Sequence, residues 1–201
     1  IDSGGQYLGG TTDITRVWPI GTPSAAQKRD YTLVLKGTIG LSRAHFPQGT
    51  LSPMLDALAR APLWAAGCDY GHGTGHGVGY FLNVHEGPQS ISKTIADANM
   101  AMQPGMITSI EPGLYRPGQW GVRIENLVLN VAAPSTEPFG EFLAFETLTL
   151  CPIDTRCIDP TLLRPDEVQW LNAYHASVRE RLQPLVEGAA RDWLIERTQP
   201  I

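Results

Sequence analysis

The chain has 201 residues, of which 42% are hydrophobic and 17% charged, and its formal net charge is −5. These values are typical of one globular domain with a sizeable core, and they exclude an intrinsically disordered chain. The modest acidic charge does not indicate a nucleic-acid-binding surface. No apolar run reaches the roughly 20 residues that a membrane-spanning helix needs. We therefore expect neither nucleic acid nor a membrane as a partner.

The three cysteines are odd in number and lack the spacing of a metal site; they are Cys68, Cys151 and Cys157. This pattern predicts reduced thiols in a cytosolic protein, with a Cys151–Cys157 bridge as the alternative. The sequence begins at Ile1, directly on a strand-like motif. We therefore expect a fragment or a processed product, and the lack of a signal peptide says little about localisation.

Residues 1–18 combine two glycine pairs with a β-branched run, which predicts a β-hairpin. The hairpin contains two carboxylates, Asp2 and Asp13, and the midpoint between them lies at Tyr7 and Leu8. A turn at that point would place the two carboxylates opposite each other on one face of the hairpin.

Two helices are predicted between residues 24 and 60. Ser24 and Gln27 have the spacing of a capping box, so the first helix should begin at Ala25. Ser52 and Pro53 look like the N-cap and first residue of a second helix, which should run to about Arg60. We expect both helices to cover a sheet.

The segment Gly71–Pro88 holds three of the five histidines, His72, His76 and His85. Five glycines between residues 71 and 79 argue against a helix and predict a tight, open loop that offers its imidazoles to a cleft. A phosphate-binding P-loop is excluded, because no Gly-Lys-Ser/Thr ends the segment. From this loop alone, a ligand role and a structural role remain equally open.

Two strands, Ile107 to Glu111 and Val122 to Val131, are predicted around a loop centred on Gly118. This register would place Glu111 and Glu125 directly opposite each other on one face. A further strand is predicted from Glu141 to Leu150.

From about residue 150 to residue 201 we expect a helical extension, with one helix beginning at Pro165. Its surplus of apolar residues could serve a subunit contact.

Carboxylates gathered in this way need cations. Two carboxylates about 4 Å apart repel each other by about 4 kcal/mol at an effective dielectric constant near 20, whereas a cross-strand pair supplies only about 0.2–1 kcal/mol. Two divalent ions would balance the four charges of Asp2, Asp13, Glu111 and Glu125, with His76 as a neutral ligand. This donor set suits Mn, Co, Fe or Zn.

Such a pair of metals could hold a hydroxide between them and polarise a substrate carbonyl. Glu111 could take the proton of the attacking water, and His85 could donate to the developing oxyanion. Arg123 shares a strand face with Glu125 and could orient a ligand carboxylate from behind. Any single acidic residue here is better explained as solvent-facing. For two pairs together with the histidine loop, that explanation becomes the weaker one.

Four blocks in this order resemble the metal-binding blocks of the pita-bread metallopeptidases: DSGGQYLGGTTDITR, GHGTGHGVGYFLNVHEGP, TSIEPGLY and GVRIENL. Within that family the sequence is most similar to the Xaa-Pro aminopeptidases (aminopeptidase P), and the closing DWLIERTQPI resembles the cytosolic, long-chain members. The resemblance implies an α+β pita-bread fold, in which covering helices pack on a curved antiparallel sheet. It also implies a cytoplasmic homodimer.

The resemblance further implies a dinuclear site, usually of manganese, with zinc or cobalt as alternatives. Asp2 would bind one metal, His76 and Glu111 would bind the other, and Asp13 and Glu125 would bridge them. Glu111 would also act as the general base. His72 and His85 would line the substrate site. The implied reaction removes an N-terminal residue that precedes proline.

The family's catalytic domain has a further segment before the first block. We therefore expect residues 1–201 to be the C-terminal portion of a single catalytic domain, with the upstream part of the same protein completing it. Two alternatives remain: a prolidase-type Xaa-Pro dipeptidase, and an inactive fragment or non-catalytic scaffold of the same fold. All five ligand positions are filled, which argues against a scaffold for the parent protein.

Overall fold

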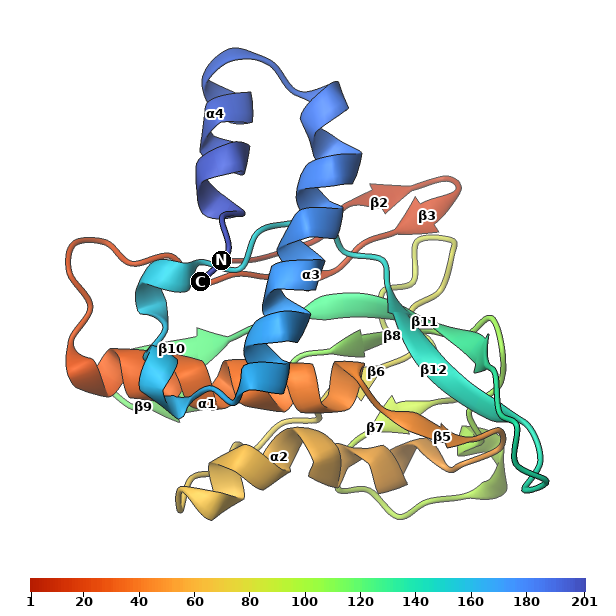
Figure 1. Ribbon diagram of the computed structural model, residues 1–201. Helices are drawn as coiled ribbons and strands as arrows, with labels where there is room; N and C mark the ends of the chain where they lie inside the picture. The colour runs from red at the N-terminus through yellow and green to blue at the C-terminus, as the bar shows by residue number, and fades with distance from the viewer.

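A computed structural model describes residues 1–201, and it has the α+β architecture that the sequence predicts. The strands are β1 (Asp2–Ser3), β2 (Gln6–Tyr7), β3 (Gly10–Thr11), β4 (Ile14–Thr15), β5 (His45–Pro47), β6 (Gly75–His76), β7 (Ser90–Ile91), β8 (Ile107–Ile110), β9 (Gly113–Arg116), β10 (Trp120–Arg123), β11 (Asn126–Ala133) and β12 (Phe142–Thr147). The α-helices are α1 (Ala25–Ser42), α2 (Asp56–Ala65), α3 (Pro165–Leu182) and α4 (Gly188–Arg197). A curved sheet runs through the molecule, with the helices packed around it (Figure 1).

The main sheet has four antiparallel strands in the order β5–β12–β11–β8. The hairpin β9–β10 continues from this sheet in the same register. Asn126 pairs with Ile110 on one side, and Arg123 pairs with Gly113 on the other. Between these pairs the register places Glu111 opposite Glu125. The predicted opposition of these two carboxylates is therefore confirmed.

The N-terminal hairpin forms as predicted, but its register is not the predicted one. Asp2 pairs with Thr15, and Tyr7 pairs with Gly10, so the turn consists of Leu8 and Gly9. The prediction that Asp2 directly opposes Asp13 is thus wrong by two positions. The reason is that Gly9 favours a two-residue turn one step later than the midpoint of the two carboxylates. A shift of two positions preserves the face, because side chains alternate with a period of two.

Helix α1 begins at Ala25 with the predicted capping box between Ser24 and Gln27. The second helix differs from the prediction. A 3₁₀ helix (Ser52–Leu55) leads into α2, which continues past Pro62 to Ala65. The Ser52 hydroxyl caps no helix and instead exchanges hydrogen bonds with the Ser90 backbone. The last turn of α2 is held by burial of Leu63 in the core, which outweighs the lost hydrogen bond at proline.

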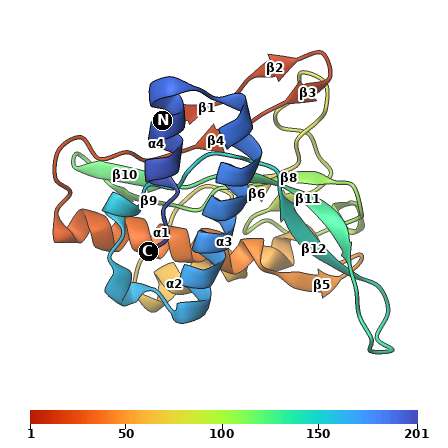
Figure 2. The same ribbon diagram turned by 45° about the horizontal axis from the view of Figure 1, so that its top comes forward.

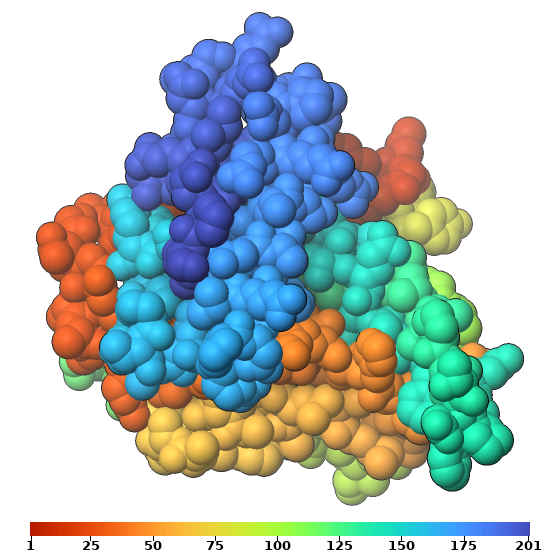
Figure 3. Space-filling model, viewed as in Figure 1, coloured from red at the N-terminus to blue at the C-terminus, as the bar shows by residue number.

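The C-terminal helices cover one face of the molecule. Helix α3 begins with Pro165 at its first position, as predicted, and crosses α1 in both ribbon views (Figures 1 and 2). Together with α4 it forms the upper part of the face seen in Figure 3. The larger of two buried clusters lies between α1, β9–β10 and α3.

All three cysteines are free thiols. None of the helices has the length and apolar character to cross a membrane.

One buried histidine in this core should make the stability depend on pH. The Nε2 atom of His175 accepts a hydrogen bond from the Ile153 backbone N–H at 3.1 Å. Burial, helped by the positive charge of Arg16, lowers the pKa of His175 to about 4. The unfolded chain therefore takes up a proton here between pH 6.5 and pH 4 that the folded chain does not, so the folded state loses stability as the pH falls.

The free energy of unfolding, measured with urea, should decrease between pH 7 and pH 4. We expect this decrease to be about 2–3 kcal/mol smaller in His175→Gln than in the wild type. His45→Gln, at an exposed position, is the control and should keep the wild-type pH profile. Parallel profiles for the wild type and His175→Gln would contradict this account.

Candidate metal centre

A polar cavity of about 410 Å³ lies between the N-terminal hairpin, the histidine loop and the ends of β8 and β10. All five predicted metal ligands line it, together with two of the other predicted site residues; they are Asp2, Asp13, His76, Glu111, Glu125, His85 and Arg123. Val84 is the one hydrophobic residue in the lining. Residues 2–13, 76–85 and 111–125, which are well separated in the sequence, therefore line one cavity.

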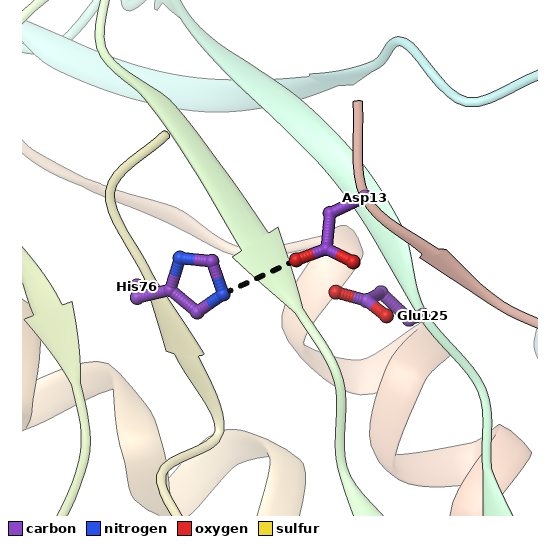
Figure 4. A group of neighbouring side chains, drawn as sticks. All are labelled: Asp13, His76 and Glu125. Carbon is purple, nitrogen blue, oxygen red and sulfur yellow. Dashed lines mark ion pairs between the residues drawn. The ribbon is translucent and has the colours of Figure 1, made fainter. Parts of the chain in front are cut away.

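His76 points its Nε2 atom at the carboxylates. This atom lies 3.5 Å from Asp13 Oδ2 (Figure 4). It also lies 3.2 Å from Glu111 Oε1. The other ring nitrogen, Nδ1, lies 3.0 Å from the Gly77 carbonyl oxygen, so the geometry assigns the proton of a neutral ring to Nδ1. This tautomer leaves the Nε2 lone pair free for a metal.

The metal-free cluster raises the pKa of His76. Burial disfavours the charged ring, but hydrogen bonds with Asp13 and Glu111 outweigh it and raise the pKa of His76 to about 10. The imidazolium thus supplies one positive charge among several negative ones. A divalent cation would supply more charge at the same place and would return His76 to its neutral form.

Glu125 is buried at the base of the cavity, with 1% of its surface exposed. The Thr15 hydroxyl donates to Oε2 at 2.7 Å, whereas Oε1 has no hydrogen-bond partner. Burial and the charge of Glu111 raise the pKa of Glu125 to about 8. One atom each of Asp13, His76 and Glu125 lie within 4.8 Å of one another (Figure 4). An unpartnered buried carboxylate oxygen beside an imidazole lone pair fits a metal ion.

Two glycines of the histidine loop allow close backbone contacts, one with β8 and one within the loop itself. A Cβ atom on Gly75 would lie 1.9 Å from the Ser109 carbonyl oxygen, and one on Gly77 would lie 1.9 Å from the Glu86 carbonyl oxygen. The Ser109 hydroxyl accepts a hydrogen bond from the His76 backbone N–H and donates to Glu111 Oε1 at 3.1 Å. His76 and Glu111 are therefore fixed relative to each other through the Ser109 hydroxyl.

Arg123 lies at the edge of the cavity, on the strand face predicted for it. Its Nη2 atom lies 2.8 Å from Asp2 Oδ2, and its Nη1 atom lies 3.7 Å from Glu111 Oε2. Half of the Asp2 side chain is exposed, so this residue is held at the mouth of the cavity, outside the group formed by the half-buried Asp13 and His76 and the buried Glu125.

The other two loop histidines have different surroundings. The ring of His85 lies against that of His76, with 4.3 Å between the centroids, and lines the cavity. His72 does not line it. The His72 Nε2 atom lies 2.8 Å from the Tyr115 hydroxyl, and its ring packs on Tyr70.

A buried arginine on α2 anchors the start of the histidine loop. Arg60 pairs with Asp56 at 2.6 Å and donates to the backbone carbonyls of Tyr70 and His72. The guanidinium also lies 3.8 Å from the centre of the Tyr70 ring. Helix α2 therefore positions the loop as well as covering the sheet.

Thr15 and Tyr115 are among the polar residues of this region that the sequence analysis did not single out. Both could have been found from strand periodicity. Thr15 lies two residues after Asp13, and Tyr115 lies four residues after Glu111, so each shares a strand face with a predicted ligand.

Family models match both the first 131 residues and the C-terminal region of this chain. Residues 1–131 match the model of metallopeptidase family M24, and residues 141–201 match that of the C-terminal region of peptidase_M24. A probable Xaa-Pro aminopeptidase P of Coprinopsis cinerea is 48% identical over 204 residues, covering 100% of this chain and 33% of that protein. Aminopeptidase P2 of Arabidopsis thaliana is 51% identical over 205 residues, covering 100% of this chain and 29% of that protein. The chain spans about a third of the length of these relatives.

Solved structures share the fold of this chain. The X-prolyl aminopeptidase of Caenorhabditis elegans, described as a cytosolic enzyme with a di-nuclear active site, superimposes with a TM-score of 0.92 at 43% identity, covering 100% of this chain and 33% of that one. Prolidase from Pyrococcus furiosus superimposes with a TM-score of 0.61 at 33% identity, covering 74% of this chain and 40% of that one. The predicted pita-bread fold is confirmed.

The raised pKa of Glu125 predicts that Glu125→Gln stabilises the protein without metal and removes its stabilisation by metal. Without metal, the folded state keeps the Glu125 proton up to about pH 8, whereas the unfolded chain releases it near the ordinary pKa of 4.5. The folded state therefore loses stability as the pH rises from 4.5 to 8. Glu125→Gln removes that cost and should raise the melting temperature above that of the wild type in EDTA at pH 8.

The same substitution removes a candidate ligand, so Mn²⁺ should no longer raise the melting temperature, as it should in the wild type. Glu146→Gln, on the exposed side of β12, should behave like the wild type in both conditions. Equal stabilisation of Glu125→Gln and the wild type by Mn²⁺ would show that Glu125 does not hold the ion.

Proposed function

Because the chain belongs to metallopeptidase family M24, we propose that its protein is a metal-dependent aminopeptidase that removes the first residue from peptides with proline in second position. The observation that carries this proposal is the cavity in which Asp13, His76 and Glu125 converge, with the unpartnered Glu125 oxygen at its base. The aminopeptidase relatives that match the whole chain support the choice of substrate. Residues 1–201 would be the C-terminal portion of the catalytic domain, with residues from about 150 to 201 as its helical extension.

We further propose that the site holds two divalent ions, and that these are manganese. Asp2 would bind one ion, His76 and Glu111 would bind the other, and Asp13 and Glu125 would bridge them. Oxygen donors with one imidazole suit Mn²⁺, and they also suit Zn²⁺ or Co²⁺. The crowding of carboxylates supports two ions, since one imidazolium and one arginine do not balance the four carboxylates once Glu125 is ionised.

When bound, such a metal pair polarises the scissile carbonyl and lowers the pKa of the attacking water. Glu111 would accept the water's proton. Its Oε1 atom accepts from the Ser109 hydroxyl, and its Oε2 atom faces Arg123, so both oxygens are oriented before substrate arrives. Arg123 would hold Asp2 and Glu111 apart and limit their repulsion.

The two remaining loop histidines would act on the substrate. His85 is exposed at the cavity wall, where its ring could donate to the oxyanion that forms at the scissile carbonyl. His72 would hold the substrate from outside the cavity, with its ring oriented by the Tyr115 hydroxyl and the Gly73 carbonyl.

Two alternatives are less well supported. A prolidase-type dipeptidase is favoured by the superposition on the prolidase of Pyrococcus furiosus, but that structure matches 74% of this chain with a TM-score of 0.61, against 100% and 0.92 for the aminopeptidase. A non-catalytic scaffold is disfavoured because all five candidate ligands are present and line one cavity.

We propose a cytoplasmic location, in keeping with the free cysteines and with the relative described as cytosolic. We also propose a homodimer, together with an upstream part of the same protein that completes the domain. Exposed apolar side chains on and before α2, Met54, Leu58 and Trp64, offer a surface for such contacts.

The protein expressed from its full reading frame and loaded with Mn²⁺ should release the first residue from Xaa-Pro peptides of three or more residues. Glu111→Gln should lower kcat by about 10²–10⁴ because the general base is lost. Glu141→Gln, which is exposed and outside the cavity, is the matched control. Release can be followed by mass spectrometry.

Cleavage of Leu-Leu substrates but not of Xaa-Pro peptides would reject the proposal. Hydrolysis restricted to Xaa-Pro dipeptides would instead identify a prolidase. Unchanged turnover by Glu111→Gln would remove Glu111 from the mechanism.

A further inference from the structure

Directly behind the cavity, a buried arginine holds three parts of the chain together. Arg16 is 4% exposed and lies three residues after Asp13, just beyond β4. Its five N–H groups reach six oxygens, all neutral, so that Nη2 shares its two N–H groups among three acceptors. The acceptors are the carbonyls of Thr15, Glu125, Cys151 and Pro152, the side-chain oxygen of Asn126 and the Tyr174 hydroxyl.

These contacts reach the candidate ligand Glu125 from two sides. The Arg16 Nη1 atom donates to the Glu125 carbonyl at 2.6 Å and to the Thr15 carbonyl at 2.9 Å. The Thr15 hydroxyl in turn donates to Glu125 Oε2 at 2.7 Å, and the Thr15 carbonyl accepts the Glu125 backbone N–H. Arg16 therefore fixes both the backbone and, through Thr15, the carboxylate of Glu125. The free Oε1 atom is left for the cavity.

Arg16 is itself held by helix α3. Its Nη2 atom donates to the Tyr174 hydroxyl at 2.9 Å, and that hydroxyl lies 2.8 Å from the Cys151 carbonyl, to which it donates. The Tyr174 ring stacks on Trp170 with an interplanar angle of 6°. Tyr174 lies within residues 141–201, the region that matches a family model of its own.

A buried guanidinium without a carboxylate partner is costly unless all its N–H groups are satisfied. Here Tyr174 and the 151–152 carbonyls supply three of the six acceptors, and all three come from the C-terminal region. Removing the Tyr174 hydroxyl should let the planar fork of Arg16 rotate, which would loosen its hold on Thr15 and Glu125.

We propose that Arg16 and Tyr174 are a pair of positioning residues through which the C-terminal helical region orients Glu125 and sets the affinity of the metal site. This inference rests on the proposed metal site and assigns the C-terminal region a role in it. Residues that orient metal ligands from behind typically change metal affinity by about 10–100-fold when replaced.

The test compares two α3 variants of the protein expressed from its full reading frame. Tyr174→Phe keeps the ring stack and removes the hydroxyl, whereas Val178→Ala opens the same core one turn further along without touching Arg16. Titration calorimetry with Mn²⁺ should give a Kd raised about tenfold for Tyr174→Phe. For Val178→Ala, the melting temperature should fall and the Kd should stay within twofold of the wild-type value. At saturating Mn²⁺, kcat and KM of Tyr174→Phe should return to within twofold of the wild type.

A wild-type Kd for Tyr174→Phe would overturn the inference, and so would an equal loss of affinity in Val178→Ala. Failure of the wild type to bind Mn²⁺ would reject the proposed function, and the inference with it. If Tyr174→Phe does not fold, Arg16→Lys retains the charge without the planar fork and should raise the Kd in the same way; an unchanged Kd would again overturn the inference.

Discussion

Mutual repulsion of carboxylates in one cavity is the constraint on which the rest of the structure depends. Glu125 is buried beside Glu111, and burial together with that charge raises the pKa of Glu125 to about 8. The metal-free chain limits the repulsion with a charged His76 and with Arg123 at the rim. A fold that retains such a cluster at a cost in stability indicates that cations complete it.

The surrounding structure keeps the cluster from relaxing. Close backbone packing at Gly75 fixes the histidine loop against β8, and packing at Gly77 fixes it against the Glu86 backbone of the same loop. Ser109 ties His76 to Glu111. Arg60 anchors the start of the loop from α2, and Arg16 fixes Glu125 from behind. The candidate ligands are therefore oriented before any ion arrives, which is the arrangement that favours tight and specific binding.

Much of this arrangement follows from local sequence signals. The capping box at Ser24 and the opposition of Glu111 and Glu125 around Gly118 were predictable, because each depends on residues close in the chain. The register of Asp2 depended on which residues form a two-residue turn, and the path of α2 past Pro62 depended on burial of Leu63. The contacts of Arg16 with Glu125 and Tyr174 join residues more than 100 positions apart, so no local sequence pattern predicts them.

Anomalous diffraction from crystals of the protein grown with Mn²⁺ tests the central claim most directly. The account predicts two peaks about 3.5–4 Å apart in the cavity. One should lie against Asp2, the other against His76 and Glu111, and both against Asp13 and Glu125. A cavity without anomalous density at saturating Mn²⁺, or Glu125 Oε1 turned away from the ion, would contradict it.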